Sequence, residues 1–550
     1  MQTRYIFVTG GVFSGLGKGI IASSIGLLLK QQGYSVSAVK IDPYINFDAG
    51  TMRPTEHGEV WVTEDGGEID QDLGNYERFL NLTLYKKNNI TTGKIFDKVI
   101  RKERNGEYLG QTVSPIPHVT DEVKNWIREV ARESLVDFVV IEIGGQVGDY
   151  ENILFLEAAR QMKLEDQVLF VHVGYLPIPD HLGEMKTKPL QHSVKSLQSL
   201  GIFPDFIAGR AKYKIDSVRK KKIAMSCSLP EDRILSVPDV DNIYSVPVVL
   251  EEQKLAEKIL NAFGLSYIID HEGFKTWKKF VDTTRALNNE VKLGIVGKYF
   301  DIGDFNLLDS YISVIEAVKH ACWNNGHQPR IAWLDSKQFE SEENLSKLGS
   351  YDGIIVPGGF GASGVEGKIN AIKFCRENNI PFLGLCYGMQ LAVIEFARNK
   401  CGMFDANTTE INPKTTHPVI DILPEQKEIL KKSEYGASMR LGAYPAVLKE
   451  GTVVSKLYGK TEISERHRHR YEVNPEMISQ IEEAGLVFSG TSPDKRLMEF
   501  IEIPSNDYFV ATQAHPEFKS RPMQPAPLFD GLIKAIVQSK RFSQQRLETK

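Results

Sequence analysis

The sequence predicts an α/β protein made of two doubly wound domains with mainly parallel sheets. Three observations support this prediction. Short apolar runs rich in β-branched residues alternate with segments of helical periodicity, which is typical of strand–helix–strand units. Glycine-rich turns follow two of these runs and lead at once into helices. The alternation loosens once, in a polar helical stretch over residues 267–290, and then begins again.

The first half of the chain contains four predicted buried strands and three predicted helices. The strands are Arg4–Gly10, Tyr34–Ile41, Val136–Gly145 and Asp166–Gly174, and the helices are Gly19–Gln32, Asp121–Glu133 and Asn152–Met162. Because strands and helices alternate along the chain, the strands should pair in parallel.

A second set of strands begins after the polar stretch. The predicted strands are Val291–Phe300, Ile331–Leu334, Tyr351–Gly359, Pro381–Cys386 and Asp507–His515. We therefore expect a first domain over residues 1–270, a linker over 271–290 and a second domain over 291–545. The polar tail from Gln538 should fray.

Composition excludes several classes of protein. Hydrophobic residues make up 42% of the 550 residues and charged residues 25%, as in ordinary globular chains. A formal net charge of −5 argues against a general binder of nucleic acid or anionic membranes. The five cysteines form no CxxC pair, and no apolar run reaches the ~18–20 residues of a membrane span. We expect a cytoplasmic protein with no nucleic-acid or membrane partner.

A glycine-rich turn, Thr9–Ile20, follows the first strand and contains Lys18. Glycines let backbone N–H groups surround phosphate oxygens, the amino end of a helix adds partial positive charge, and the lysine supplies a point charge. Gly19 stands where a Walker A motif has the Ser or Thr that holds Mg²⁺. The segment predicts phosphate binding, and the alternative is a structural glycine turn.

Two carboxylates are candidates for the missing metal ligands. Glu142 ends an apolar strand, where side chains reach the ligand crevice of a parallel sheet, and Asp72 lies in EIDQDLGNYERF. The alternative for Glu142 is a buried acid paired with an arginine. The alternative for Asp72 is a helix N-cap or a solvated loop acid.

Basic residues gather in a third region of the first half. Lys186 and Lys188 lie in the run Gly183–Leu197, and Lys222 lies in a further basic run. Such runs are usually solvated faces. A triphosphate substrate would favour the alternative that they bind ligand, because several positive groups are needed to hold its charge.

The second half contains a candidate nucleophile. Gly384–Gly388 is the cysteine version of a nucleophile elbow, with Cys386 between a strand and a helix whose amino end lowers the thiol pKa. His515 and Glu517 could supply the base and its orienting acid, and the glycine-rich turn in Asp352–Gly364 could supply an oxyanion hole. The alternative is an inert buried thiol. The other four cysteines are interpreted as structural.

These motifs resemble two known families. The second half resembles class I glutamine amidotransferase domains through PGGFG, GLCYGMQ and HPE. The first half resembles the P-loop-like amidoligase domain of CTP synthases. The matching runs are VTGGVFSGLGKG, KIDPYINFDAGTMRPTEHGEVWVTEDGGEIDQDLGNYERF, IEIGGQVGDYEN and KTKPLQHSVKSLQ, with ERHRHRYEVN in the second half. The resemblance covers nearly the whole chain.

The resemblance implies a glutamine-hydrolysing ligase that converts ATP, UTP and glutamine to CTP, ADP, phosphate and glutamate. ATP would first phosphorylate UTP at O4, and ammonia would then displace phosphate in the last step of de novo CTP synthesis. The resemblance also implies Mg²⁺ as cofactor, GTP as activator, CTP as feedback inhibitor, a homotetramer and a dry passage for ammonia.

The resemblance also carries site residues onto this sequence. Phosphates would contact Ser14, Gly15, Leu16, Gly17, Lys18, Gly19 and Ile20, with Lys18 on the transferring group and Asp72 and Glu142 on Mg²⁺. The UTP and CTP pocket would contain Asp149, Tyr150, Glu151, Lys186, Thr187, Lys188, Pro189, Leu190, Gln191 and Lys222. The ATP base would lie near Arg210, Pro238, Asp239 and Val240. Cys386, His515 and Glu517 would hydrolyse glutamine, which Gly359, Tyr387, Gly388, Met389, Gln390, Glu410 and Arg470 would bind.

Three positions depart from the family's usual pattern. Gln146 replaces a common Thr, Ser114-Pro115 replaces QV, and Ser363 stands where many members have arginine. The last change puts any detailed statement about GTP activation in doubt. None of the three touches the proposed nucleophile, base, metal ligands or Lys18.

Three other functions compete with this interpretation. Another glutamine-dependent ATP ligase would use an acyl acceptor and would not need Lys186–Gln191. A non-catalytic nucleotide switch would leave Cys386 and His515 without a role. An RNA contact through His467–Arg470 lacks the interleaved aromatic residues that stack on bases.

Overall fold

The structure of the chain is a computed structural model. It describes residues 2–13, 15–53, 57–181, 183–268, 271–297, 301–302, 305–306, 308–359, 361, 363–422 and 439–539. For 301–302, 305–306 and 308–309 it describes only the backbone. Ser14 and the tail beyond Ser539 lie outside the described residues.

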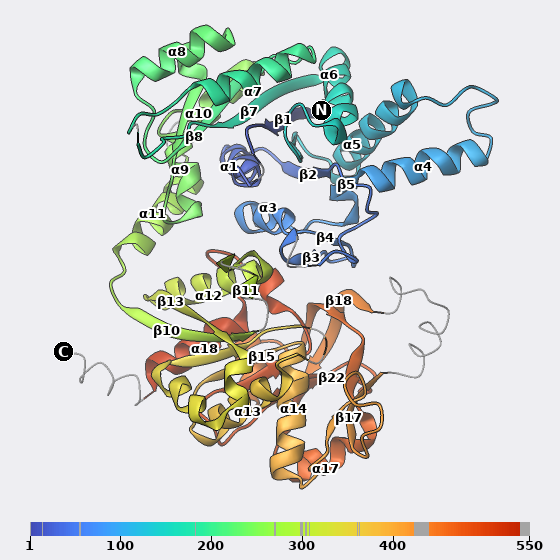
Figure 1. Ribbon diagram of the computed structural model, residues 1–550, viewed down its shortest axis with the longest axis vertical. Helices are drawn as coiled ribbons and strands as arrows, with labels where there is room; N and C mark the ends of the chain where they lie inside the picture. Colours follow the sequence, from blue (N-terminus) through green and yellow to red (C-terminus); the bar gives the residue numbers. More distant parts are fainter. Residues whose placement is uncertain are drawn as a thin grey trace. The chain divides into compact units, whose positions relative to one another are not determined.

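The chain forms two compact units (Figure 1). The first contains Met1–Ala49 and Asp72–Thr283, and the second contains Gly50–Gln71 and Thr284–Lys550. The expected domains place the whole of residues 1–270 together. In the structure a segment of 22 residues within that range, Gly50–Gln71, groups with the second unit.

The first unit is built on a seven-stranded sheet whose described strand pairs are all parallel, in the order β5-β2-β6-β1-β7-β8-β9. The strands are β1 (Arg4–Gly10), β2 (Val36–Asp42), β5 (Asn89–Thr91), β6 (Phe138–Ile143), β7 (Gln167–Tyr175), β8 (Phe206–Ala211) and β9 (Ile234–Pro238). The four strands predicted in this half are confirmed, and they are β1, β2, β6 and β7.

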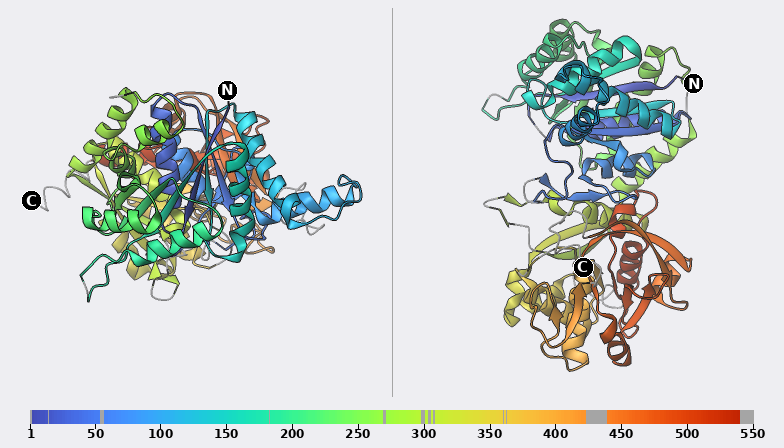
Figure 2. Two further views of the ribbon diagram at one scale, coloured as in Figure 1. Left: turned by 90° about the horizontal axis from the view of Figure 1, so that it is seen from above. Right: turned by 90° about the vertical axis from the view of Figure 1, so that its right-hand side faces the viewer.

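Helices cover both faces of this sheet (Figure 1). They are α1 (Lys18–Gln31), α3 (Asp72–Leu80), α4 (Thr92–Arg104), α5 (Thr120–Ser134), α6 (Ile153–Glu165), α7 (Lys188–Ser199), α8 (Ser217–Cys227), α9 (Val246–Glu251), α10 (Leu255–Ala262) and α11 (Glu272–Ala286). Apolar side chains of α4, α5 and α6 pack on one sheet face, against Phe7, Ile141 and Phe170, while α1 covers the other face. Figure 1 and the left view of Figure 2 show that α4 extends beyond the sheet as an arm.

The second unit is built on a nine-stranded sheet in the order β13-β10-β14-β15-β23-β22-β21-β18-β19. The strands are β10 (Glu290–Gly297), β13 (Gln328–Asp335), β14 (Gly353–Val356), β15 (Phe382–Leu385), β18 (Arg440–Leu448), β19 (Glu462–His469), β21 (Val487–Thr491), β22 (Met498–Glu502) and β23 (Phe509–Thr512). The first five strands in this order pair in parallel, as predicted. The other four extend the sheet by antiparallel pairing, which the sequence did not predict.

Two helical layers enclose this second sheet. The helices are α12 (Ile312–Asn324), α13 (Val365–Glu377), α14 (Tyr387–Lys400), α16 (Val453–Tyr458), α17 (Ile478–Glu483) and α18 (Pro527–Gln538). Apolar residues of α13 and α14 form the core on one face, and those of α12 and α18 form the core on the other. Small sheets are formed by β16 (Asn407–Thr408), β17 (Pro418–Ile422) and β20 (Tyr471–Val473), and by β11 (Asp301–Ile302) and β12 (Phe305–Asn306).

The segment Gly50–Gln71 joins the second unit as a hairpin of β3 (Val60–Val62) and β4 (Glu68–Asp70). The buried Trp61 ring lies with its centroid 4.9 Å from that of Phe518. Ala443 donates its backbone N–H to the Glu64 carbonyl at 2.9 Å, and Arg466 donates to the Val62 carbonyl at 3.0 Å. We call this segment the inserted hairpin. Its contacts make it part of the second unit's core.

Candidate functional site

The phosphate loop joins β1 to α1 as the sequence predicts. Gly17 precedes the helix in the left-handed conformation, with φ of 85°, which favours glycine. The buried Lys18 donates from Nζ to the carbonyl of Gly145 at 3.0 Å. Burial lowers the pKa of Lys18, and the nearby Glu142 carboxylate opposes that shift. A Cβ atom on Gly10 would lie 2.7 Å from Cδ of Lys18, so the absence of a side chain at Gly10 makes room for the aliphatic part of Lys18.

Asp72 and Glu142 come together beside Gly19. A Cβ atom at position 19 would lie 2.9 Å from Oδ1 of Asp72 and 3.2 Å from Oε2 of Glu142. The two carboxylates therefore approach the space that a Walker serine or threonine would use. Paired carboxylate oxygens next to a phosphate loop are the hard ligands that Mg²⁺ takes together with nucleotide phosphates, so these residues fit that ion.

The surroundings of the two acids differ. Lys40 lies 2.5 Å from Asp72, and although burial acts to raise the pKa of Asp72, this lysine holds it below its ordinary value. Glu142 is buried and accepts a hydrogen bond from the hydroxyl of Tyr76. Burial, together with Asp72, raises the pKa of Glu142 to about 7. The alternative of an acid paired with an arginine does not describe Glu142, because its hydrogen-bond partner is a tyrosine.

A cavity of about 330 Å³ adjoins the phosphate loop and contains the residues expected near the ATP base. Arg210, Pro238, Asp239 and Val240 line it together with Gly17 and Ile20. Arg210 donates to the Asp239 carboxylate at 2.6 Å and to the Leu16 carbonyl at 3.3 Å. The arginine therefore ties the loop to the wall of this cavity.

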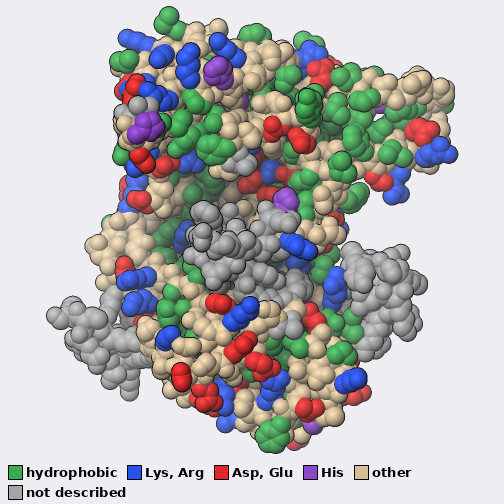
Figure 3. All heavy atoms as spheres, in the orientation of Figure 1, with side chains coloured by type: hydrophobic (Ala, Val, Ile, Leu, Met, Phe, Trp, Pro, Cys, Tyr) green, Lys and Arg blue, Asp and Glu red, His purple; other side chains and the backbone are tan. Residues whose placement is uncertain are grey.

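The residues expected around UTP form two separate groups. Asp149 accepts a hydrogen bond from the backbone N–H of Gln146, and Tyr150 is 91% exposed. In the other group Lys186 pairs with Glu184 at 2.7 Å, and Gln191 donates to Thr187 at 2.9 Å. Among the described residues, no hydrogen bond or ion pair joins Asp149–Glu151 to Lys186–Gln191. Lys222 is exposed on α8, where Figure 3 shows lysine and arginine side chains gathered.

Cys386 occupies the sharp turn between β15 and α14. Its φ of 51° lies in the left-handed region, which is strained for a residue with a Cβ atom, and its N–H bonds to the Thr512 carbonyl at 2.7 Å. A Cβ atom on Gly388 would lie 2.1 Å from the Val356 carbonyl, so this glycine permits the close packing of helix on sheet. These features are those of a nucleophile elbow.

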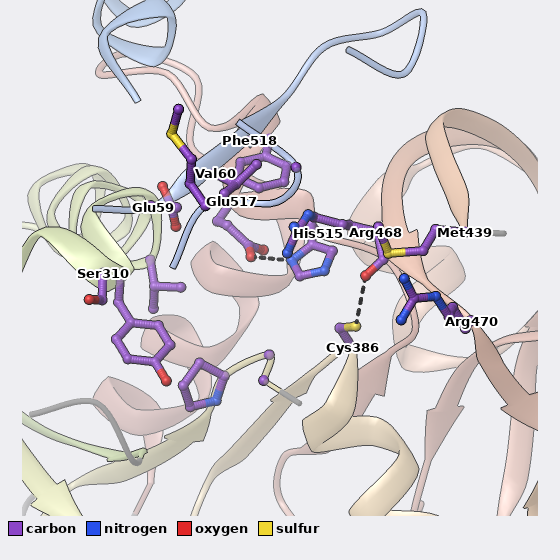
Figure 4. A pocket seen from close by; sticks show the side chains of 17 residues that line it. Glu59, Val60, Ser310, Cys386, Met439, Arg468, Arg470, His515, Glu517 and Phe518 are labelled. Atoms are coloured by element: carbon purple, nitrogen blue, oxygen red, sulfur yellow. Dashed lines mark hydrogen bonds and ion pairs between the residues drawn. The ribbon is translucent and has the colours of Figure 1, made fainter. Parts of the chain in front are cut away.

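His515 and Glu517 complete the arrangement that the sequence predicts. His515 Nδ1 lies 2.7 Å from Glu517 Oε1, and Nε2 has no hydrogen-bond partner among the described residues. Figure 4 shows the imidazole facing Cys386. Burial acts to lower the pKa of His515, but Glu517 and Cys386 outweigh it and raise the pKa to about 10. Glu517 and Cys386 therefore favour the imidazolium form of His515.

A cavity of about 270 Å³ opens over these side chains (Figure 4). Gly358, Gly359, Cys386, His515 and Glu517 line it. The inserted hairpin contributes Gly50, Met52, Glu59 and Val60 to the same wall. Trp61 packs on Phe518, and the Phe518 ring in turn stacks on His515 with centroids 5.3 Å apart. A segment from the first 71 residues of the chain therefore supports the candidate base.

A narrower pocket beside Cys386 contains most of the residues expected to bind glutamine. Gly359, Tyr387, Gln390, Glu410 and Arg470 line it. Glu410 accepts a hydrogen bond from the backbone N–H of Gly361 at 3.1 Å. Gly388 and Met389 are not among its lining residues, and Met389 packs in the core beneath the elbow.

Sequence reasoning missed several residues at both sites. Arg468 lines the cavity of about 270 Å³ above Cys386. Its carbonyl oxygen lies 3.8 Å from the Cys386 sulfur, and its side chain donates to Glu68 at 2.8 Å. Gln513 donates to the same sulfur at 3.7 Å. Lys40 and Tyr76 contact the two carboxylates. The runs ERHRHRYEVN and NYERF contain Arg468 and Tyr76, but their spacing does not indicate what these residues contact.

Two further findings bear on the sequence-based expectations. None of the five cysteines, all of which lie among the described residues, forms a disulfide. Among the described helices, none has both the length and the apolar character needed to cross a bilayer.

Comparisons with known proteins match both halves of the chain. The family model described as CTP synthase N-terminus matches residues 4–265, and the model described as glutamine amidotransferase class-I matches residues 306–535. The chain is 53% identical to the CTP synthase of Pyrococcus abyssi over 99% of both chains. It is 54% identical to that of Methanocaldococcus jannaschii over 98% of this chain and 99% of the relative. A solved structure, described as the glutaminase domain of Trypanosoma brucei CTPS with bound acivicin, is 37% identical. It covers 46% of this chain and 98% of its own, with a TM-score of 0.42.

Proposed function

The chain belongs to the CTP synthase family, and we propose that it aminates UTP to CTP with ATP and the amide nitrogen of glutamine. One observation carries this proposal. A single chain has a phosphate loop with a carboxylate pair in one unit and a Cys–His–Glu cavity in the other. The first can activate an oxygen with ATP, and the second can release ammonia.

In the first unit, Lys18 and the loop N–H groups would hold the phosphates of ATP. Asp72 and Glu142 would hold Mg²⁺, which supplies charge neutralisation between phosphate oxygens when it is bound. The uracil O4 is a poor leaving group, so transfer of the ATP γ-phosphoryl group to O4 would precede attack by ammonia at C4. Phosphate would then leave and CTP would form. The position of Lys18, near the carboxylate pair, supports a role on the transferring group.

In the second unit, the Cys386 thiolate would attack the glutamine carboxamide. The negative charge would develop on the carbonyl oxygen, which N–H groups of the Gly358–Gly359 turn can stabilise. His515 would give its proton to the departing ammonia, and Glu517 would hold the imidazole through Nδ1. Water would then cleave the thioester and release glutamate. The pocket lined by Glu410 and Arg470 offers opposite charges for the two ionic groups of an amino acid.

Several finer points belong to the same proposal. UTP, and CTP as inhibitor, would bind at Asp149–Glu151, Lys186–Gln191 and Lys222. GTP would activate the enzyme, the protein would be a homotetramer, and it would act in the cytoplasm. Their support is the resemblance to the family and, for the location, the unpaired cysteines.

The decisive experiment separates the two half-reactions. Cys386→Ala should abolish CTP formation from glutamine while retaining CTP formation from ammonium ions, because ammonia in solution replaces the product of the second unit. CTP formation is followed by absorbance with ATP, UTP and Mg²⁺.

The matched control is Cys401→Ala, a half-buried cysteine outside both cavities, which should retain both activities. Loss of both activities in Cys386→Ala would contradict the division of labour. Failure of the unsubstituted protein to make CTP from ammonium would contradict the proposed acceptor.

A further inference from the structure

Three buried polar side chains meet on one face of the first unit's sheet. Thr9 on β1 and His172 on β7 are directly opposite each other in the parallel ladder. The Thr9 hydroxyl lies 2.9 Å from Nδ1 of His172, and the Ser193 hydroxyl on α7 lies 2.8 Å from Nε2. The exposed fractions of Thr9, His172 and Ser193 are 1%, 0% and 8%. We call these three residues the Thr–His–Ser bridge.

A neutral imidazole satisfies both ends of the bridge. A neutral ring has one N–H donor and one acceptor nitrogen, and each hydroxyl can act as either donor or acceptor. Burial lowers the pKa of His172 to about 3, and the positive charge of Lys18 adds to the shift. Both ring nitrogens are therefore occupied, and the ring has no free position with which to act as an acid or base.

Each end of the bridge continues into a predicted nucleotide-binding segment. Thr9 immediately precedes Gly10 and Gly11 at the start of the phosphate loop. A Cβ atom on Gly11 would lie 1.8 Å from the Ser193 hydroxyl oxygen, so the loop backbone rests directly on this serine. On the other side, α7 begins at Lys188, and its first turn contains Gln191, which bonds to Thr187.

The surroundings argue against a purely packing role. On the same face of β7 the preceding inward residues are Val168 and Phe170, which belong to the apolar core. An apolar side chain at position 172 would continue that pattern without the cost of burying three polar groups. The polar residue, His172, stands opposite Thr9, next to the point where the chain leaves β1 to form the phosphate loop.

We propose that His172 is a positioning residue of the ligase reaction: through Thr9 and Ser193 it holds the phosphate loop and helix α7 at a fixed separation. This inference rests on the proposed function, because the separation sets how the ATP γ-phosphoryl group meets an acceptor held by the start of α7. His172 itself touches no substrate.

The test removes one hydrogen bond at a time. Thr9→Val and Ser193→Ala each delete a hydroxyl with little change in shape, and Thr9→Ser restores the hydroxyl at position 9. Ser199→Ala is the matched control, because Ser199 is an exposed hydroxyl at the other end of α7. Each protein is assayed at full length for ammonium-driven CTP formation, for KM of ATP and UTP, and for the rise in unfolding temperature caused by ATP with Mg²⁺.

Thr9→Val and Ser193→Ala should each lower kcat about tenfold and should shrink the ATP-dependent rise in unfolding temperature. Thr9→Ser and Ser199→Ala should behave like the unsubstituted protein. A merely structural role predicts lower unfolding temperatures without ATP but unchanged kcat at permissive temperature, and that result would overturn the proposal. An equal fall in Ser199→Ala would also overturn it.

Failure of the proposed function gives a different result. If the unsubstituted protein makes no CTP from ammonium, the acceptor is wrong. The ATP-dependent rise in unfolding temperature then decides the inference, because it depends on the phosphate loop and not on the acceptor. An unchanged rise in Thr9→Val and Ser193→Ala would refute the bridge's role.

Discussion

At position 19 the lack of a side chain allows two carboxylates to lie beside the phosphate loop. Asp72 and Glu142 approach within 2.9 Å and 3.2 Å of the place where a Cβ atom would stand. In a Walker A loop the residue at this position offers its own hydroxyl to the metal. Here the proposed ligands, Asp72 and Glu142, lie instead on α3 and β6, two elements that are distant in sequence.

Gly19→Ala should therefore weaken the metal site. The added methyl group would push the two carboxylates apart, and we expect the Mg²⁺ concentration for half-maximal ammonium-driven activity to rise about tenfold. The measurement is a Mg²⁺ titration of CTP formation at saturating nucleotide.

Gly26→Ala is the control for this substitution. Gly26 lies on the same helix, and its added Cβ atom would meet the methyl end of Leu80 instead of the carboxylates. Its Mg²⁺ requirement should not change. An unchanged Mg²⁺ requirement in Gly19→Ala would show that the placement of the two carboxylates does not depend on the missing side chain at position 19.

The buried imidazole of His172 predicts a sensitivity to acid. Its pKa is lowered to about 3 by burial, so the neutral ring favours the folded state above its ordinary pKa of about 6.5. That stabilisation is lost as the pH falls from about 6.5 towards 3, and it amounts to about 5 kcal/mol at most. His172→Gln, which keeps a donor and an acceptor, should flatten this part of the acid unfolding curve.

The acid experiment compares unfolding of the full chain by circular dichroism across that pH range. His192→Gln is the control, because His192 is exposed on α7. The two variants should differ most near pH 4. Identical curves for His172→Gln and the unsubstituted protein would contradict the neutral buried ring.

At the scale of single residues, sequence patterns identified the groups that we propose perform chemistry but not the groups that contact them. Lys18, Cys386 and His515 stand in motifs whose local geometry is fixed by glycines and by strand ends, so their positions could be predicted. Lys40, Tyr76 and Arg468 reach the sites from elements far away in sequence. Their spacing carries no signal, because the contacts arise only when the sheets form.

Among the elements, the inserted hairpin has the greatest effect on the amidotransferase site. Arg466 is 1% exposed and bonds to Glu64 at 3.0 Å, and Lys519 bonds to the same carboxylate at 3.0 Å. Burial acts to raise the pKa of Glu64, but the two cations hold it below its ordinary value. The hairpin is thus tied to β19 by charge and to Phe518 by Trp61.

Glu64→Gln should loosen this attachment. The substitution would remove the negative charge that pairs with the buried guanidinium of Arg466. We expect the free energy of unfolding to fall by about 2 kcal/mol, seen as a fall of about 4 °C or more in the unfolding temperature. Because Phe518 stacks on His515, glutaminase activity should fall before global unfolding.

Glu462→Gln serves as the matched control for the hairpin. Glu462 is exposed at the start of the same strand as Arg466, so its unfolding temperature and glutaminase activity should not change. Equal effects of the two substitutions would mean that net charge, and not the Glu64–Arg466 contact, controls stability.

Sequence patterns predicted the elements that alternate regularly and missed those that do not. The parallel strands appear as continuous apolar runs because both of their faces are buried. The strands β18, β19 and β22 carry charged residues that are buried, such as Arg440, which pairs with Glu499. Their sequences therefore look polar, and the pairing that offsets the charges is visible only in the folded sheet.

For the whole molecule, the most informative feature is that the chain passes between the two units three times. It crosses after Ala49, after Gln71 and after Thr283. A boundary near residues 271–290 follows from the loss of strand–helix alternation. The grouping of Gly50–Gln71 with the second unit was not predicted, because it depends on contacts with residues some 400 positions later.

Cutting the chain near the last crossing should not separate the two pieces. A protease site inserted between Leu287 and Asn288, after α11, would cut the covalent path at that point, while the inserted hairpin would still be packed in the second unit. The cleaved protein should elute as a single species in native gel filtration and should still make CTP from glutamine.

The same protein cleaved and then placed in denaturant provides the control, and its fragments should elute separately. Separation under native conditions would show that the hairpin contacts are too weak to hold the two pieces together.

The three crossings also limit how such an enzyme can be rebuilt by recombination. Two folds joined end to end can be exchanged by a single genetic fusion, whereas this chain carries part of its glutaminase inside its ligase. A foreign amidotransferase grafted at residue 284 would meet a hairpin evolved for another partner, and the native contact of that hairpin with Phe518, which supports His515, would be lost. Exchange would succeed only if both pieces moved together, so the insertion favours inheritance of the two activities as one gene.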